Sequence, residues 1–442
     1  MTLFERSSGC KMHRTAASQK CKFLALGKWQ NELTQEMIPH SFFSLSDHLD
    51  FLGVTLKSTY AMTRRVNGDT LQDRIRKVIG PWRAGRFMAL NLRPHSVNTY
   101  AISKLMYKFN TIDPRIGDIK IFNKTVNSFI YADLLEKPDE LTLYRDIESG
   151  GLGLMHIQNR AKAALISTFL QTAINPNFSR NFYHNYLYRY YILGENLPKP
   201  DIPPNFAGDF FPIIRKLRES LTDIENSNLK SVYNFLMTEI LCDPTQTDDD
   251  LIAPLIPLKC EREAPETDWK RSWRLTRMKG LGPDLTSFMM KTLWRVIPTR
   301  SRLHRILPAV YQSPDCQHCG TLQARTPETQ DHALYTCEAN QGLPDKLLMV
   351  LKRHQPGAEQ RSILTLDLDL EPSLELPFTW IIGTVLSSIW TQKEIRRVDL
   401  NKTRANLEAG CRILRNSQAK TWQNASTLAE ILIGQIFKDL PL

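Results

Sequence analysis

The sequence predicts a mainly α-helical protein built from several modules, with a small antiparallel β element near its amino terminus. Apolar residues recur at helical spacing over most of the chain, and the two β-prone runs, each closed or kinked by glycine, precede residue 60. Two breaks, the first of them rich in proline, divide the helical part. With 442 residues and 42% hydrophobic content, the chain can form about three globular cores.

The β-prone runs are 21–27 and 49–56, and we expect them to pair with each other. Beyond Asn67-Gly68 the apolar residues take helical spacing until Gly80-Pro81, where the helix should end. Further helices are predicted at 96–109, 117–135, 157–174, 209–221, 227–241, 267–278, 284–296, 344–354, 376–397, 399–416 and 425–437.

Two breaks, a proline-rich passage at 197–204 and a second break at 243–265, set the expected module boundaries. The predicted modules are a β-containing start at 1–60, a helical domain at 61–196, a helical connector at 197–265, a cysteine-containing module at 266–342 and a helical tail at 343–442.

The chain carries 57 Lys and Arg against 46 Asp and Glu, a net charge of +11 that suits a polyanionic partner; a merely solvated basic surface is the alternative. The amino terminus lacks the layout of a signal peptide, and the apolar stretch 378–390 is too short to span a bilayer. Eight cysteines are too few for a disulfide scaffold. We therefore expect an intracellular protein, in the nucleus or cytoplasm, without a membrane partner.

The strongest chemical signal is the spacing Cys316-x2-Cys319-x12-His332-x4-Cys337. The first pair can form a tight loop, and His332 and Cys337 return from about one helical turn to complete a tetrahedron. Three thiolates and an imidazole suit Zn²⁺, and a closed set of four ligands predicts a structural ion. Chance spacing of unrelated cysteines is the alternative. His318, inside the loop, is expected to point away.

A basic strip precedes this segment and should contact nucleic acid phosphates. Its cations are Lys270, Arg271, Arg274, Arg277, Lys279, Arg295, Arg300 and Arg302, with Arg305 beyond them. Trp269, Trp273 and Trp294 are interleaved with these cations and could stack on bases, although packing in the core is the favoured interpretation.

Other patterns exclude several enzyme classes. Gly150-Gly151-Leu152-Gly153 lacks the Gly-Lys-Ser/Thr of a phosphate loop and is expected to form a turn that packs two helices. Motifs of serine hydrolases and zinc proteases are absent from the sequence. Asp248 to Asp250, in a polar loop, and Asp367 with Asp369, alternating with leucines, are interpreted as solvated carboxylates. No small-molecule substrate is expected.

Several segments, in chain order, resemble the carboxy-terminal portion of LINE-type (non-LTR) retrotransposon reverse transcriptases. They are Ser8-Gly9-Cys10-Lys11-Met12-His13, Phe51-Leu52-Gly53-Val54, Pro81-Trp82-Arg83-Ala84-Gly85-Arg86, Ser103-Lys104-Leu105-Met106-Tyr107, Gly150 to Gly153, Leu293-Trp294, Ile297-Pro298-Thr299, Glu328-Thr329 and the four predicted metal ligands. The resemblance covers most of residues 1–340.

This resemblance implies a remnant of the polymerase palm at 1–60 with a primer grip at Phe51, Leu52 and Gly53, a thumb-like helical domain, and the family's zinc-binding region. It implies RNA or DNA as partner, and a separate palm and fingers segment as a further partner. The phosphate contacts that it predicts in the thumb are Arg64, Arg65, Arg74, Arg76, Lys77, Arg83, Arg86 and Lys104.

The chain departs from the family because it begins after the point where the catalytic aspartates would lie. Tyr131-Ala132-Asp133-Leu134 resembles the catalytic box, but Leu134 replaces one of the two carboxylates that two-metal chemistry needs, and its neighbours keep helical spacing. We expect no polymerase activity. The alternatives are a subunit or truncated form of an active RNA-directed DNA polymerase, a zinc-stabilised protein-interaction scaffold, and a non-functional relic of an inserted element.

Overall fold

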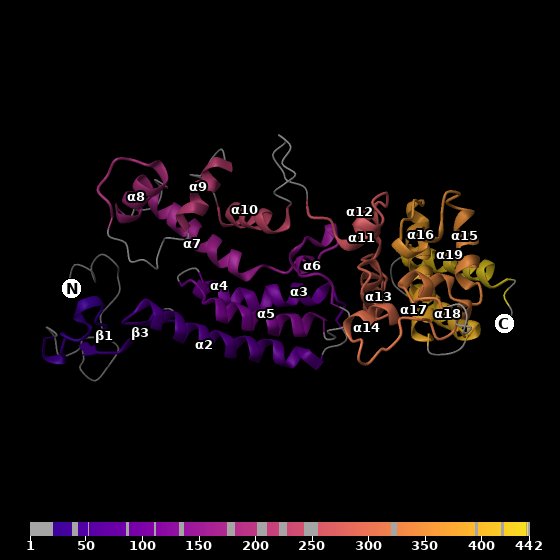
Figure 1. Ribbon diagram of the computed structural model, residues 1–442, viewed down its shortest axis with the longest axis horizontal. Coiled ribbons are helices and arrows are strands. Elements are labelled where there is room, and N and C mark those ends of the chain that lie inside the picture. Colours follow the sequence, from indigo (N-terminus) through magenta and orange to yellow (C-terminus); the bar gives the residue numbers. More distant parts are fainter. Residues whose placement is uncertain are drawn as a thin grey trace. The chain divides into compact units, whose positions relative to one another are not determined.

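The computed structural model describes residues 21–37, 43–51, 53–84, 88–109, 112–131, 137–174, 182–200, 210–220, 228–242, 255–319, 325–393, 397–416, 420–438 and 440. The protein is mostly helical with a small β element near its amino terminus, as predicted (Figure 1). Its contacts form two compact units. Unit 1 comprises Met1–Pro81, Asn98–Val126 and Met155–Glu239, and unit 2 comprises Trp82–Val97, Asn127–Leu154 and Ile240–Leu442.

The β element differs from the expected pairing of the two β-prone runs. Strand β1 (Cys21–Phe23) pairs in parallel with β2 (Phe43–Leu45). The run 49–56 instead folds back on itself, with β3 (His48–Phe51) antiparallel to β4 (Val54–Lys57). Gly53 permits this tight turn, because its φ of +81° is one that residues with a Cβ rarely adopt. The described residues therefore contain two small sheets in place of one antiparallel unit.

Helix α2 (Tyr60–Ile79) begins earlier than Asn67-Gly68, the dipeptide after which the helix was expected to start. The hydroxyl of Thr59 caps it by accepting a hydrogen bond from the N–H of Met62 at 3.2 Å. Asn67 is buried within the helix, and its amide bonds both the N–H and the carbonyl of Thr55 on β4. Glycine follows it because a Cβ at position 68 would lie 2.3 Å from Oδ2 of Asp118 on α5.

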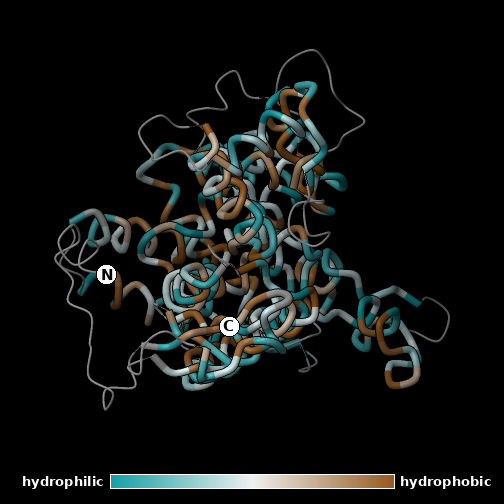
Figure 2. Tube along the Cα trace, turned by 90° about the vertical axis from the view of Figure 1, so that its left-hand side faces the viewer, coloured by the Kyte–Doolittle hydropathy of each residue, from teal (hydrophilic) through white to brown (hydrophobic). Residues whose placement is uncertain are grey.

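The remaining helices of unit 1 include most of the π-helical turn η5 (Val97–Ile102), α4 (Ser103–Phe109), most of α5 (Ile116–Tyr131), α7 (Ile157–Ala173), α8 (Phe182–Tyr188), η7 (Arg189–Leu193), α9 (Phe210–Ser220) and most of α10 (Leu229–Leu241). The elements from α7 to α10 pack around one apolar cluster. Leu170, Leu187, Ile214 and Val232 from four of these elements meet in the cluster. Figure 2 shows the alternation of apolar and polar residues along the helices, which gives each one a face to bury.

Unit 2 contains α3 (Leu92–Ser96), α6 (Glu140–Tyr144), η6 (Ile147–Ser149), α11 (Lys259–Glu263), α12 (Trp269–Leu275), α13 (Pro283–Leu293), α14 (Arg300–Ile306), η8 (His332–Thr336), η9 (Glu338–Asn340), α15 (Leu343–Lys352), α16 (Gln360–Thr365), α17 (Pro372–Thr391), α18 (Leu400–Arg415) and α19 (Lys420–Phe437). Helix α17 is buried on nearly all sides, because α12, α13, α15, α18 and α19 pack around it. Among the described residues, no helix has the length and apolarity to cross a bilayer.

The glycine-rich segment forms a tight turn, and within unit 2 it packs against the tryptophans. Gly150 has a φ of +79°, and a Cβ there would lie 2.3 Å from Cε2 of Trp273. The indole N–H of Trp294 donates to the carbonyl of Gly150 at 2.8 Å. Trp273 and Trp294 are buried with their ring centroids 6.2 Å apart. These two tryptophans are therefore core residues and are not available for base stacking.

Candidate metal centre and cationic surface

The loop that carries Cys316 and Cys319 is held by a short antiparallel bridge in unit 2. Asp315 pairs with Pro327, the N–H of Cys316 donates to the carbonyl of Thr326 at 2.8 Å, and the N–H of Glu328 donates to that of Pro314 at the same distance. The bridge thus holds the segments 314–316 and 326–328 side by side. It also fixes the backbone of Cys316.

His332 and Cys337 lie at the two ends of the wide turn η8. The hydroxyl of Thr329 accepts from the N–H of His332 at 3.2 Å, which fixes the start of the turn. The N–H of Cys337 donates to the carbonyl of His332 at 2.8 Å, so a five-residue step closes the turn. In a regular α-helix, residues five apart point about 140° away from each other. The wider turn, followed by extended backbone at Cys337, brings both side chains to one side.

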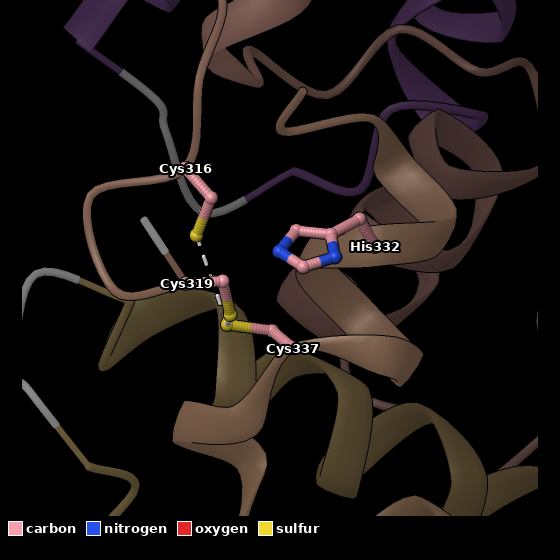
Figure 3. A group of neighbouring side chains, drawn as sticks. All are labelled: Cys316, Cys319, His332 and Cys337. Carbon is pink, nitrogen blue, oxygen red and sulfur yellow. Dashed lines mark hydrogen bonds between the residues drawn. The ribbon is translucent and has the colours of Figure 1, made fainter. Parts of the chain in front are cut away.

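The four predicted ligands converge, with candidate ligand atoms all within 4.8 Å of one another. The Sγ of Cys337 lies 3.8 Å from that of Cys316 and 3.5 Å from that of Cys319. A tetrahedral centre with metal–sulfur bonds of about 2.3 Å requires sulfurs about 3.8 Å apart. Figure 3 shows the imidazole of His332 facing the three sulfurs. The structure therefore brings together a group that could bind a metal ion.

The imidazole of His332 has one nitrogen that fits a metal ligand. Its Nε2 is buried and has no hydrogen-bond partner, whereas Nδ1 lies 3.1 Å from the hydroxyl of Thr336. Metal-binding histidines commonly use the second nitrogen to hold the ring in this way. Burial lowers the pKa of His332, which favours the neutral form that can donate a lone pair. Sequence reasoning missed Thr336, whose only signal is its position four residues after the histidine.

Cys316 and Cys337 are buried and Cys319 is partly buried, and two of the three sulfurs receive backbone hydrogen bonds. The N–H of His318 points at the Sγ of Cys316 at 3.5 Å, and the N–H of Glu338 points at the Sγ of Cys319 at 3.4 Å. Burial raises the pKa of the thiols of Cys316 and Cys337. A bound cation would reverse this effect, because metal binding displaces the thiol protons.

His318 points away from the centre, as expected. Its Nε2 lies 2.5 Å from the carbonyl oxygen of Lys393, just beyond α17. Among the described residues, no other group of three or more His, Cys, Asp or Glu side chains gathers closely enough to hold an ion.

Four cations of the basic strip line one groove beside α12, which we call the α12 groove. It has a volume of about 460 Å³ and is lined by Lys270, Arg271, Arg274, Arg277, Glu148 and Asp268. The guanidinium of Arg274 forms a bidentate ion pair with the carboxylate of Glu375, with N–O distances of 2.8 and 2.5 Å. A guanidinium nitrogen of Arg271 lies 3.0 Å from a carboxylate oxygen of Asp369. The Nε of Arg277 donates to the carbonyl of Trp273. Part of the groove's positive charge is therefore neutralised within the protein.

The other cations of the strip differ in their surroundings. Lys279 and Arg305 are exposed. Arg295, with a φ of +59°, is bonded to Asp331 and lies 3.7 Å from Glu263. The backbone N–H of Arg300 donates to a carboxylate oxygen of Glu328, and the guanidinium of Arg302 donates to the carbonyl of Lys137. These three residues thus have structural contacts within unit 2.

The predicted thumb cations of unit 1 are mostly exposed. Arg64 is the exception, because its guanidinium bonds the carbonyl of Asp113 at 2.8 Å and the carboxylate of the same residue at 3.1 Å. The exposed side chains are those of Arg65, Arg74, Arg76, Lys77 and Lys104. The side chain of Arg83, and all of Arg86, lie outside the described residues.

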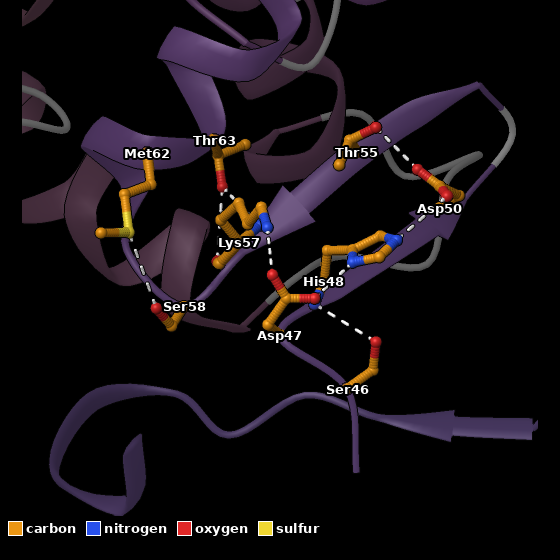
Figure 4. Close-up of polar contacts among 9 residues, drawn as sticks. All are labelled: Ser46, Asp47, His48, Asp50, Thr55, Lys57, Ser58, Met62 and Thr63. Atoms are coloured by element: carbon orange, nitrogen blue, oxygen red, sulfur yellow. Dashed lines mark hydrogen bonds and ion pairs between the residues drawn. The ribbon is translucent and has the colours of Figure 1, made fainter. Parts of the chain in front are cut away.

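The hairpin that resembles a primer grip exposes 66% of Phe51 beside Gly53, while Leu52 lies outside the described residues. A polar network covers its base (Figure 4). Lys57 contacts Asp47 at 2.6 Å, and the ring of His48 lies 2.5 Å from the other oxygen of that carboxylate. The hydrogen bond from Lys57, and then that from His48, lower the pKa of Asp47 to about 2.

The other acidic candidates gather no metal site in the described part of the chain. Tyr131 is the buried last residue of α5, and Val126, Phe129 and Ile130 before it lie on that helix, as expected. Asp133 and Leu134 lie outside the described residues. Asp248 to Asp250 also lie outside them. The chain matches no protein-family model and no curated protein sequence.

Proposed function

We propose that this chain binds RNA or DNA through a basic surface, and that a structural zinc ion stabilises the unit that carries the α12 groove. The convergence of Cys316, Cys319, His332 and Cys337 carries the proposal. Three sulfurs and one imidazole nitrogen are a donor set that selects Zn²⁺, and four protein ligands leave no position for a catalytic water. Zinc binding would contribute on the order of 10 kcal/mol to local folding.

The α12 groove supports the nucleic-acid part of the proposal. Lys270 and Arg274 lie four residues apart on α12, Arg277 lies in the turn that follows the helix, and all three line the groove. Several cations along one groove suit a phosphate backbone, and release of counterions supplies the affinity. The net charge of +11 also favours the binding of a polyanion.

The family resemblance adds a more specific proposal. The chain would correspond to the carboxy-terminal portion of a non-LTR retrotransposon reverse transcriptase, with Phe51 and Gly53 in the primer-grip turn and the exposed cations of unit 1 on the thumb. It would bind nucleic acid without polymerising, alongside a separate palm and fingers segment. The order of the motifs along the sequence supports this.

Metal analysis of the purified full chain tests the zinc centre. We expect about one zinc ion per chain, lost in Cys316→Ser and in His332→Ala, because each removes one of four ligands. Cys260→Ser is the matched control, since Cys260 is a buried cysteine outside the cluster and should leave the zinc content unchanged. Zinc-free wild-type protein, or full zinc content in Cys316→Ser, would contradict the assignment.

Titration with single-stranded and duplex RNA and DNA at several salt concentrations tests nucleic-acid binding. We expect affinity to fall steeply as salt rises, and Lys270→Gln to make that dependence shallower by about one unit on a log–log scale. A second candidate, a protein-interaction scaffold, is favoured by the internal ion pairs of Arg271 and Arg274. Retained zinc without affinity for any oligonucleotide would support the scaffold.

A further inference from the structure

One face of η5 and α4 in unit 1 has a pattern that goes beyond the phosphate contact that the family resemblance predicts at Lys104. From Thr99 onward, exposed residues alternate with buried ones at helical spacing. We call the exposed residues the α4 stripe: Thr99, Tyr100, Ser103, Lys104 and Tyr107. Ala101, Ile102, Leu105 and Lys108 are buried behind them, and α4 packs against α7. The stripe is thus the outward face of a well-packed helix.

The stripe exposes two aromatic rings. Tyr100 is 54% exposed and Tyr107 is 50% exposed. They are seven residues apart, which corresponds to about 10 Å along a helix, or about three nucleotides of one strand at 3.4 Å each. The residues between them on this face are small except for Lys104, and the hydroxyl of Ser103 is bonded to the carbonyl of Thr99. Both tyrosines are therefore half-exposed on one face of the helix.

The stripe itself carries a positive charge. Lys104 lies between the two rings along the helix and is exposed, and the segment from Asn98 to Ile112 contains no Asp or Glu. Burial and the nearby charge of Arg74 lower the pKa of Lys108, so cations of α2 and α4 lie close together, with Asp50 partly offsetting them. A polyanion is favoured over an acidic or neutral protein surface.

We propose that the α4 stripe is a stacking platform for unpaired bases, in which Tyr100 and Tyr107 stack on bases of one strand and Lys104 contacts a phosphate between them. Every base has a π face, so such a platform tolerates any sequence but requires bases that are not already stacked in a duplex. The inference rests on the proposed nucleic-acid binding and adds a preference for single strands.

The test compares the full chain with its variants on a fluorescently labelled single-stranded RNA of about 16 nucleotides, its DNA counterpart and the matching duplexes. The double variant Tyr100→Ala/Tyr107→Ala should lose roughly 5- to 100-fold in affinity for both single strands and keep its duplex affinity. Its salt dependence should match that of the wild type, because the phosphate contacts are retained. Lys104→Gln should instead make the salt dependence shallower by about 0.7 on a log–log scale.

Two further variants make the outcome specific. Tyr100→Phe/Tyr107→Phe keeps both rings and should bind like the wild type. Tyr183→Ala, which removes a 43% exposed tyrosine on α8 of the same unit, should have no effect. Unchanged single-strand affinity in the double alanine variant, or an equal loss in the phenylalanine variant, overturns the platform and leaves the proposed function standing. If the wild type binds no nucleic acid, both fail.

Discussion

Gly150 and Gly151 set how closely the glycine turn approaches its surroundings in unit 2. A Cβ on Gly150 would overlap the indole of Trp273, and a Cβ on Gly151 would lie 1.9 Å from the carbonyl oxygen of Arg145. Trp273 is 1% exposed and contacts the rings of both Trp269 and Trp294. Because interiors are close-packed, a single added methyl group must move this whole row of rings.

We predict that Gly150→Ala lowers the free energy of unfolding of unit 2 by about 2–4 kcal/mol, from the left-handed backbone and the overlap together. Urea denaturation followed by tryptophan fluorescence measures this. Gly357→Ala is the matched control, because a Cβ there meets nothing within 4 Å. Equal stability of the two variants would show that the turn does not pack closely against Trp273.

The convergence of Cys316, Cys319, His332 and Cys337 could be predicted from the sequence because residue type and spacing are both visible there. Contacts between distant residues could not. Arg274 and Glu375 are separated by 101 positions, and neither has a local signal that points to the other. Whether a cation is available for a phosphate therefore depends on partners that only the folded chain reveals.

At the scale of single elements, α2 shows how a local signal can mislead. Asn67-Gly68 has the composition of a turn, but Asn67 uses its amide to bond β4, the carbonyl of Thr63 and the ammonium of Lys108. Position 68 in this helix is a glycine because α5 passes too close for a Cβ. Both residues serve tertiary contacts, which composition does not encode. The parallel pairing of β1 with β2 was not predicted either, because it is also a contact between segments distant in the sequence.

We predict opposite effects for two glycine-to-alanine changes in helices of unit 1. Alanine stabilises an exposed helical position by up to about 1 kcal/mol, so Gly117→Ala on α5, where nothing lies within 4 Å, should be neutral or stabilising. Gly68→Ala should cost about 1–3 kcal/mol, because the new Cβ meets Asp118, which Arg115 and Gln72 hold in place. Thermal unfolding followed by far-ultraviolet circular dichroism distinguishes them, and a stabilising Gly68→Ala would contradict the close crossing of α2 and α5.

At the scale of the whole molecule, the candidate metal centre and the carboxy-terminal helices belong to the same unit. The N–H of Val398 donates to the carbonyl of Ala339 at 2.9 Å, and the side chain of Gln341 donates to the carbonyl of Val398 at 2.6 Å. His318 reaches Lys393, 75 positions away. The sequence predicted the metal ligands and the tail helices separately, because hydrogen bonds over such separations leave no periodic pattern.

If the four residues hold a metal ion as proposed, its removal should therefore destabilise the whole of unit 2. Trp29 belongs to unit 1, and the other seven tryptophans belong to unit 2, so tryptophan fluorescence reports almost entirely on unit 2. We predict that a chelator lowers the midpoint of the fluorescence-detected transition by about 10 °C or more. Cys316→Ser should reproduce this shift without chelator, whereas Cys260→Ser should respond to chelator like the wild type. A transition that is insensitive to chelator would rule out a stabilising metal.

The hydrogen bond from Cys337 to His332 also limits how this centre can evolve. One residue added inside that turn would rotate the cysteine by about 100° relative to the imidazole and break the closing bond. Insertions should therefore be tolerated elsewhere in the chain before they are tolerated here. The spacing of five residues between His332 and Cys337 should therefore be constant among distant homologues, even where the rest of the sequence varies.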